Sequence, residues 1–101
     1  MTTTVYVGQG LVFIDADKVP PSGRLKAHTR LSICLAGEYV AIMEVNLPDG
    51  VELLPGSQHT VPVRMLTDRE LSTDIDYEIR NPINPIGQLR LSSLELEKPL
   101  R

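Results

Sequence analysis

The sequence predicts an all-β fold, a small closed antiparallel barrel of about six strands. Apolar residues recur at every second position in several short segments, and Gly, Pro and Asn residues separate these segments. No stretch of useful length has the 3.6-residue period of an amphipathic helix. Closing such a sheet on itself buries its aliphatic face and removes exposed edges. The 101-residue length fits a single domain over residues 1–101.

The first strand is expected from Thr3 to Val7, resuming at Leu11 to Ile14 after Gly8-Gln9-Gly10. We expect a β-bulge at this glycine pair. A phosphate-binding glycine loop is followed by a helix, whereas a strand-like segment follows here. Strict alternation from Leu25 to Leu35 predicts the next half-buried strand.

A turn at Ala36-Gly37 leads into an expected strand from Glu38 to Val45. One face of this strand carries Tyr39, Ala41, Met43 and Val45, and the other carries Val40 and Ile42. Because both faces are apolar, Val40 and Ile42 are candidates for a dimer contact. The sequence alone does not fix the oligomeric state.

Two further strands are expected at Val61 to Met65 and at Asp74 to Arg80. Pro62 has no N–H to donate to a ladder, which predicts an edge or a bulge at that position. The outer face of the later strand is an acidic row of Asp74, Asp76 and Glu78. We interpret this row as a solvated face opposed by Arg64 or Arg69.

The apolar residues of the last expected strand switch from odd-numbered to even-numbered positions. Leu89 and Leu91 share one parity, and Leu94 and Leu96 share the other. A bulge near Ser92-Ser93 would direct all four side chains into the core.

Composition and charge limit the function classes. The net charge of −3 argues against a protein whose main task is to neutralise phosphates. The single cysteine, Cys34, excludes a disulfide within the chain. No secretory signal precedes Val5, and no apolar run approaches the roughly 20 residues that cross a bilayer. We therefore expect a cytoplasmic protein that does not insert into membranes.

A turn-rich joint, Leu47-Pro48-Asp49-Gly50-Val51-Glu52 followed by Pro55-Gly56, connects two strand patterns. Together with Val61 to Leu66 and Ile75 to Arg80, in the same order and spacing, it resembles the C-terminal (third) β-barrel domain of the elongation factor Tu family. The resemblance covers nearly the whole chain and is best from Leu47 to Arg80. It implies a stand-alone barrel without the GTPase, which lies in a different domain of that family.

In that family the third domain helps to hold the T arm of aminoacyl-tRNA and contacts the GTPase domain and the exchange factor. The resemblance therefore implies a non-enzymatic protein-interaction or regulatory module, with translation factors among its partners. We expect its contact loop at the last hairpin, at Arg80, Ile83, Asn84 and Ile86. Prolines stiffen this loop, so little ordering entropy is lost on docking. The alternative is a rigid turn with both isoleucines folded back.

A second hypothesis is an RNA-binding accessory protein that contacts tRNA through a basic row of Lys26, His28 and Arg30. The acidic net charge disfavours it. So does Pro82-Ile83-Asn84, which replaces a flexible Gly-Gly-Arg of the family and removes a phosphate partner.

No motif in the sequence indicates an enzyme. His28 and Cys34 share a strand face in the predicted pattern, but six strand residues separate them by roughly 20 Å. His59 could complete a site only by being folded close to one of them. We therefore expect no catalytic or metal-binding residues and no cofactor.

Overall fold

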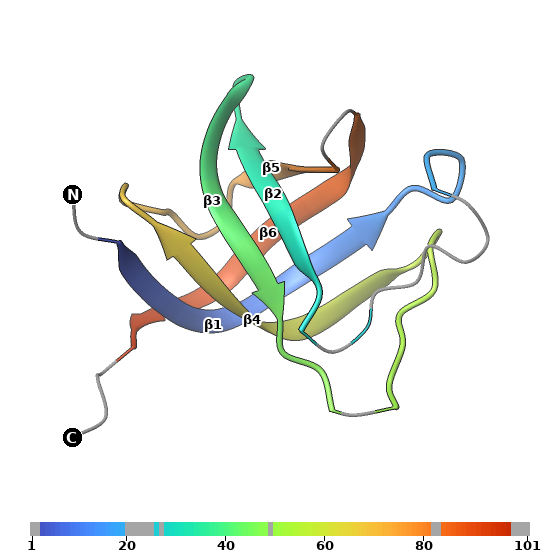
Figure 1. The fold of residues 1–101 in the computed structure, drawn as a ribbon, viewed down its shortest axis with the longest axis horizontal. Helices are drawn as coiled ribbons and strands as arrows, with labels where there is room; N and C mark the ends of the chain where they lie inside the picture. The colour runs from blue at the N-terminus through green and yellow to red at the C-terminus, as the bar shows by residue number, and fades with distance from the viewer. Residues whose placement is uncertain (1–2, 20–25, 27, 49, 82–83, 98–101) are drawn as a thin grey trace.

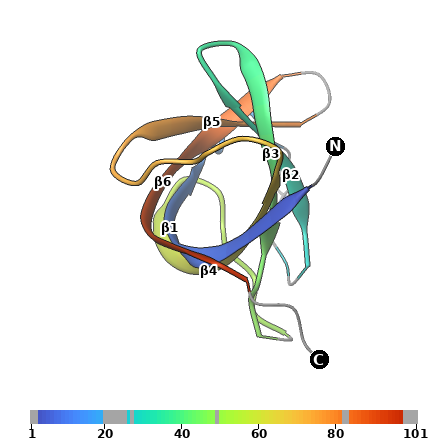
Figure 2. The same cartoon turned by 90° about the vertical axis from the view of Figure 1, so that its left-hand side faces the viewer.

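Six antiparallel strands form a closed barrel in the computed structural model, which describes residues 3–19, 26, 28–48, 50–81 and 84–97 (Figure 1). The strands are β1 (Thr4–Ile14), β2 (Arg30–Leu35), β3 (Glu38–Val45), β4 (Gln58–Thr67), β5 (Asp76–Arg80) and β6 (Pro85–Leu96). Their order around the barrel is β1-β4-β3-β2-β5-β6, and β6 pairs with β1 to close it. Figure 2 shows the strands surrounding a central core. The predicted all-β barrel is confirmed.

Aliphatic side chains from all six strands fill the interior. Met43 pairs with Met65 across β3 and β4, and both side chains are fully buried. Ile33, Ile79 and Leu89 are fully buried as well. Each such side chain contributes about 1.5–3 kcal/mol by leaving water, so the alternating pattern drives closure. No helix in the described part of the chain is long and apolar enough to span a membrane.

Strand β1 runs without interruption through Gly8-Gln9-Gly10, where the sequence suggested a break. The irregularity lies opposite these residues, because Ser92 is an extra residue on β6 and shifts the register between Gln9 and Gly10. The Ser92 hydroxyl donates to the Gln9 carbonyl, and the Gln9 N–H donates to the Ser93 hydroxyl, both at 3.2 Å. The predicted bulge near Ser92-Ser93 is confirmed.

The glycines of β1 are required because β6 approaches closely. A Cβ at Gly8 would lie 2.0 Å from the Ser93 carbonyl oxygen. Beyond the bulge, Leu94 packs against the core as predicted, but Leu96 is 63% exposed, so its predicted burial is wrong. Strand β5 begins opposite Arg90, and β6 beyond that point has a strand neighbour only on the β1 side.

Strand β2 begins at Arg30, so the predicted start at Leu25 is wrong. Residues 25 and 27 lie outside the described part of the chain. His28 has a φ of 64°, a left-handed conformation that no strand continues through. The Thr29 N–H donates to the Lys26 carbonyl at 3.2 Å, which closes a turn. Lys26, His28 and Thr29 therefore belong to a turn that precedes the strand.

A bulge at Val40 changes which side chains of β3 face the core. The register between β2 and β3 shifts at this point, and Val40 is the extra residue. Val40 and Ala41 are both buried, whereas Tyr39 is 51% exposed, so the predicted alternation, in which Tyr39 and Ala41 share a face opposite Val40, is wrong at this point. The buried hydroxyl of Thr67 donates to the Val40 carbonyl at 2.6 Å. Val40 therefore packs inside its own chain and is not exposed for a dimer contact.

Pro62 lies in β4, which has strand neighbours on both sides and a regular register, so the predicted edge or bulge is wrong. The Asn46 N–H donates to the Pro62 carbonyl at 2.9 Å, which places the Pro62 nitrogen on the same side, toward β3. The β3–β4 ladder ends at the pair Val45–Val63. The missing N–H therefore falls just beyond the last pair.

Candidate functional site

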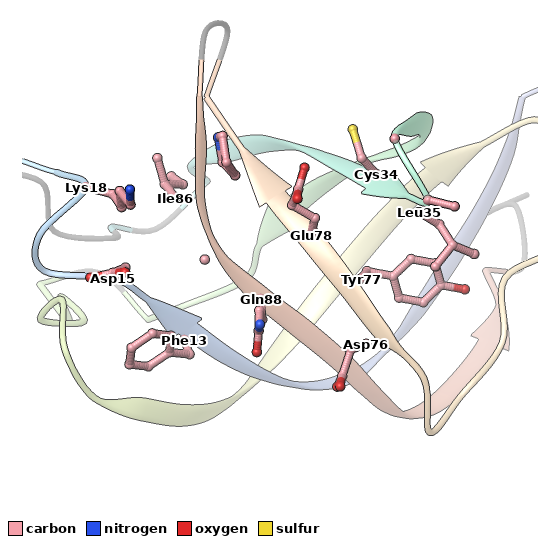
Figure 3. A pocket seen from close by; sticks show the side chains of 14 residues that line it. Phe13, Asp15, Lys18, Cys34, Leu35, Asp76, Tyr77, Glu78, Ile86 and Gln88 are labelled. Carbon is pink, nitrogen blue, oxygen red and sulfur yellow. The ribbon is translucent and has the colours of Figure 1, made fainter.

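A groove of about 470 Å³ crosses the outer face of the barrel beside the β5–β6 hairpin (Figure 3). We call it the outer groove. It is lined by Phe13, Asp15, Lys18, residues 34–37, residues 76–78 and residues 85–88. Its volume falls within the range of about 300–1,000 Å³ that is usual for ligand sites.

The floor of the outer groove is one row of side chains that crosses four strands. Phe13 on β1 pairs with Gln88 on β6, Gln88 pairs with Glu78 on β5, and Glu78 pairs with Cys34 on β2. Phe13, Gln88 and Glu78 alternate with buried residues, so their side chains belong to the outer face. Cys34 follows the inward-facing Ile33 but is itself only 6% exposed. The accessible part of the row combines an aromatic ring, an amide and a carboxylate, which suits contact with an extended chain through apolar and hydrogen-bonding groups.

The predicted contact loop only partly agrees with the structure. Ile86 is 5% exposed and belongs to the core, so its expected exposure is wrong. The register shift between β5 and β6 makes Ile86 an extra residue, and this bulge turns it inward. Asn84 is exposed, and its N–H donates to the Asn81 side chain at 2.7 Å. Arg80 is half-buried beside the groove, and Ile83 lies outside the described residues.

The predicted basic row is wrong as a row on one strand. Lys26 and His28 are exposed but precede β2, and only Arg30 belongs to the strand. The Arg30 guanidinium lies 3.0 Å from the Glu44 carboxylate on β3. The turn at His28 separates the three side chains that the alternation placed together.

All five arginines of the described residues form ion pairs. The pairs are Arg30–Glu44, Arg64–Glu97, Arg69–Glu38, Arg80–Glu78 and Arg90–Asp76. The acidic row is therefore opposed by Arg80 and Arg90, and the expectation of Arg64 or Arg69 is wrong. The hydrogen bonds that Arg64 donates to the Glu97 carboxylate raise the pKa of Arg64, and the one that Arg90 donates to the Asp76 carboxylate raises the pKa of Arg90. These exposed pairs contribute little to stability, but they neutralise charge that a phosphate-binding surface would present.

The cysteine and histidine side chains lie in different places. Cys34 is on the outer face of β2, and His28 is in the preceding turn. His59 shares the inward parity of Val61 on β4, and its Nε2 is buried without a hydrogen-bond partner. No group of three or more His, Cys, Asp or Glu side chains among the described residues is arranged to hold a metal ion.

A second hollow of about 340 Å³ lies over β3 and β4, lined by residues that include Tyr39, Ile42 and Leu66. Desolvation raises the pKa of Tyr39, and nearby Cys34 and Asp68 raise it further. Ile42, the other candidate dimer residue, is half-buried there. This hollow spans fewer strands than the outer groove.

Sequence reasoning missed Phe13 and Gln88, because strand pairing brings them together from distant segments. One signal was present. In the run Leu11-Val12-Phe13-Ile14, apolar residues occupy both parities, which indicates that the outward face of this segment is also partly covered.

The sequence matches no protein-family model, and the comparison with curated proteins found no match either. The resemblance to the elongation factor Tu barrel therefore stays a prediction from the sequence.

Proposed function

We propose that this protein is a non-enzymatic interaction module that binds a segment of another protein in the outer groove. The observation that supports this proposal is the row Phe13–Gln88–Glu78–Cys34, built on four hydrogen-bonded strands. A site on paired strands is held rigidly, so binding sacrifices little conformational entropy. Phe13 offers apolar area, while Gln88 and Glu78 offer groups that hydrogen-bond to a peptide backbone.

Translation factors are the first partners to test, because of the resemblance to the third domain of elongation factor Tu. The hairpin that the sequence predicted as a contact loop borders the outer groove through Glu78, the ion-pair partner of Arg80. Ion pairing of the described arginines favours a protein partner over RNA. Binding of tRNA is therefore the alternative outcome of the test.

The test is capture from a cell extract by the immobilised protein, with bound protein and RNA both identified. Gln88→Trp fills the groove at an exposed strand position, and Thr60→Trp is the matched control on an exposed position of β4 outside it. We expect a defined protein that wild type and T60W retain and Q88W loses. Equal capture by all three chains would refute the groove as the binding site, and retention of tRNA alone would favour the RNA-binding function.

A further inference from the structure

One end of the outer groove carries a surplus negative charge. Glu78 is neutralised by Arg80, with 3.4 Å between carboxylate oxygen and guanidinium nitrogen. Asp76 lies 2.9 Å from Arg90, and its hydrogen bond raises the pKa of Arg90, as does the charge of nearby Asp74. A single guanidinium therefore faces two carboxylates, Asp74 and Asp76, at this end.

The other end, formed by the turn after β1, has the same surplus. Asp15 and Lys18 line the groove, and Asp17 lies between them in the chain. The Asp15 carboxylate accepts from the Asp17 N–H at 2.9 Å, and the Asp15 carbonyl accepts from the Lys18 N–H at 3.1 Å. None of the three side chains forms an ion pair within the described part of the chain. Two carboxylates here face one ammonium group.

An aromatic ring and an amide separate the two ends. Figure 3 shows Phe13 and Gln88 between Asp15 and Asp76. Because Phe13, Gln88 and Glu78 are register partners, Asp15 lies two residues beyond this row, directly after the end of β1, and Asp76 lies two residues before it on β5. Two strand spacings across and four residues along place the two ends roughly 17 Å apart. An extended chain covers that distance in about five residues.

We propose that the outer groove binds an extended basic peptide segment in which two cationic side chains, six residues apart so that both face the groove, flank an apolar one on the same face. The cations meet the surplus carboxylates at the two ends, and the apolar side chain contacts Phe13. This inference rests on the proposed function and specifies its partner. Complementary charge makes the groove select against acidic segments, since like charges repel.

The probes are fluorescein-labelled nine-residue peptides. The first has lysines at its second and eighth positions, leucine at its fourth and serine elsewhere, so that all three side chains share one face when the peptide is extended. The second has glutamates in place of the lysines, the third serines in place of the lysines, and the fourth adjacent lysines. Binding to the 101-residue protein is measured by fluorescence anisotropy at low salt, and the site is mapped from backbone amide NMR shifts.

Two double variants carry the same change in net charge. Asp15→Asn removes a carboxylate that lines one end of the groove, and Asp74→Asn removes one whose charge acts on Arg90, the partner of groove residue Asp76, at the other end. Glu70→Gln with Glu95→Gln removes two exposed carboxylates that do not line it. We expect the spaced-lysine peptide to shift groove amides, and to bind D15N/D74N about fivefold more weakly, since exposed charge pairs contribute modestly. The E70Q/E95Q control should bind as wild type does.

Equal weakening in both double variants would overturn the proposal, because it would reduce the binding to general attraction by an acidic protein. Tight binding of the glutamate peptide, or equal binding of adjacent and spaced lysines, would overturn it too. If the serine peptide shifts the groove amides and the spaced-lysine peptide does not, the charge argument is refuted, while the proposed function remains supported. If no peptide shifts groove amides, both the inference and the groove are refuted.

Discussion

Replacing Gly8 by alanine tests the reasoning about barrel closure. The new Cβ would lie 2.0 Å from the Ser93 carbonyl oxygen, 2.8 Å from its carbon and 3.1 Å from Leu94 Cα. An ordinary carbon–oxygen contact is about 3.3 Å, so β6 would have to withdraw by about 1.3 Å. Overpacking destabilises by about 1–3 kcal/mol, and an obstruction made of backbone places this case near the upper limit.

Alanine also reduces the conformational entropy of the unfolded chain, which offsets about 0.4–1 kcal/mol of this destabilisation. The free energy of unfolding should therefore fall by about 2 kcal/mol in total. For a domain of this size the melting temperature should fall by about 8–16 °C, measured by far-ultraviolet circular dichroism. The control is Gly37→Ala, where the φ of 81° is unfavourable but no atom lies within 4 Å. The free energy of unfolding of G37A should be about 1 kcal/mol lower than that of wild type, because alanine is unfavourable in this backbone conformation. If G8A is no less stable than G37A, the inferred close approach of β1 and β6 is wrong.

Three further predictions concern single side chains. His59→Leu should raise the free energy of unfolding by about 1 kcal/mol, because it removes a buried nitrogen without a partner; a lower urea midpoint would contradict this. Thr67→Val leaves the Val40 carbonyl without its hydrogen bond and should lower the free energy of unfolding, measured in urea, by about 1–3 kcal/mol. Thr67→Ser keeps the hydroxyl and should retain most of that free energy. The pKa of Tyr39 is raised above its ordinary value of 10.0, first by desolvation. Because the folded pKa exceeds the unfolded one, this contribution to stability is complete below pH 10.0 and is lost as the pH rises through the folded pKa. The melting temperature should fall less steeply above pH 10.0 in Tyr39→Phe than in wild type. An equally steep fall in both proteins would mean that other groups cause it.

The fold was predictable where the pattern of apolar residues is compatible with only one arrangement of the strand. The parity change between Leu91 and Leu94 indicated the bulge at Ser92, because an extra residue is what restores both side chains to one face. The bulge at Val40 gave no such signal, since β3 is apolar on both faces and a shift in parity leaves the pattern unchanged. Two-sided apolarity therefore hides irregularities that one-sided alternation reveals.

The start of β2 was not predictable from alternation alone. The residues before Arg30 happen to alternate, but His28 adopts a left-handed conformation whose cause lies in contacts elsewhere, including its N–H bond to the Val45 carbonyl. The candidate site was less predictable still. Phe13, Gln88 and Glu78 become neighbours only through pairing of β1, β6 and β5, and local sequence does not specify that register.

The pairing of the first strand with the last has a consequence for how the chain is made. During synthesis β1 can pair with β4 as soon as residue 67 is available, but its other edge stays open until β6 follows. A nascent barrel lacking β6 therefore exposes a template on which a second chain can add a strand. Long sequence separation also slows folding, toward the millisecond-to-second range typical of β-barrels. The twelve residues of β6 thus decide whether each new chain becomes a barrel or an aggregate.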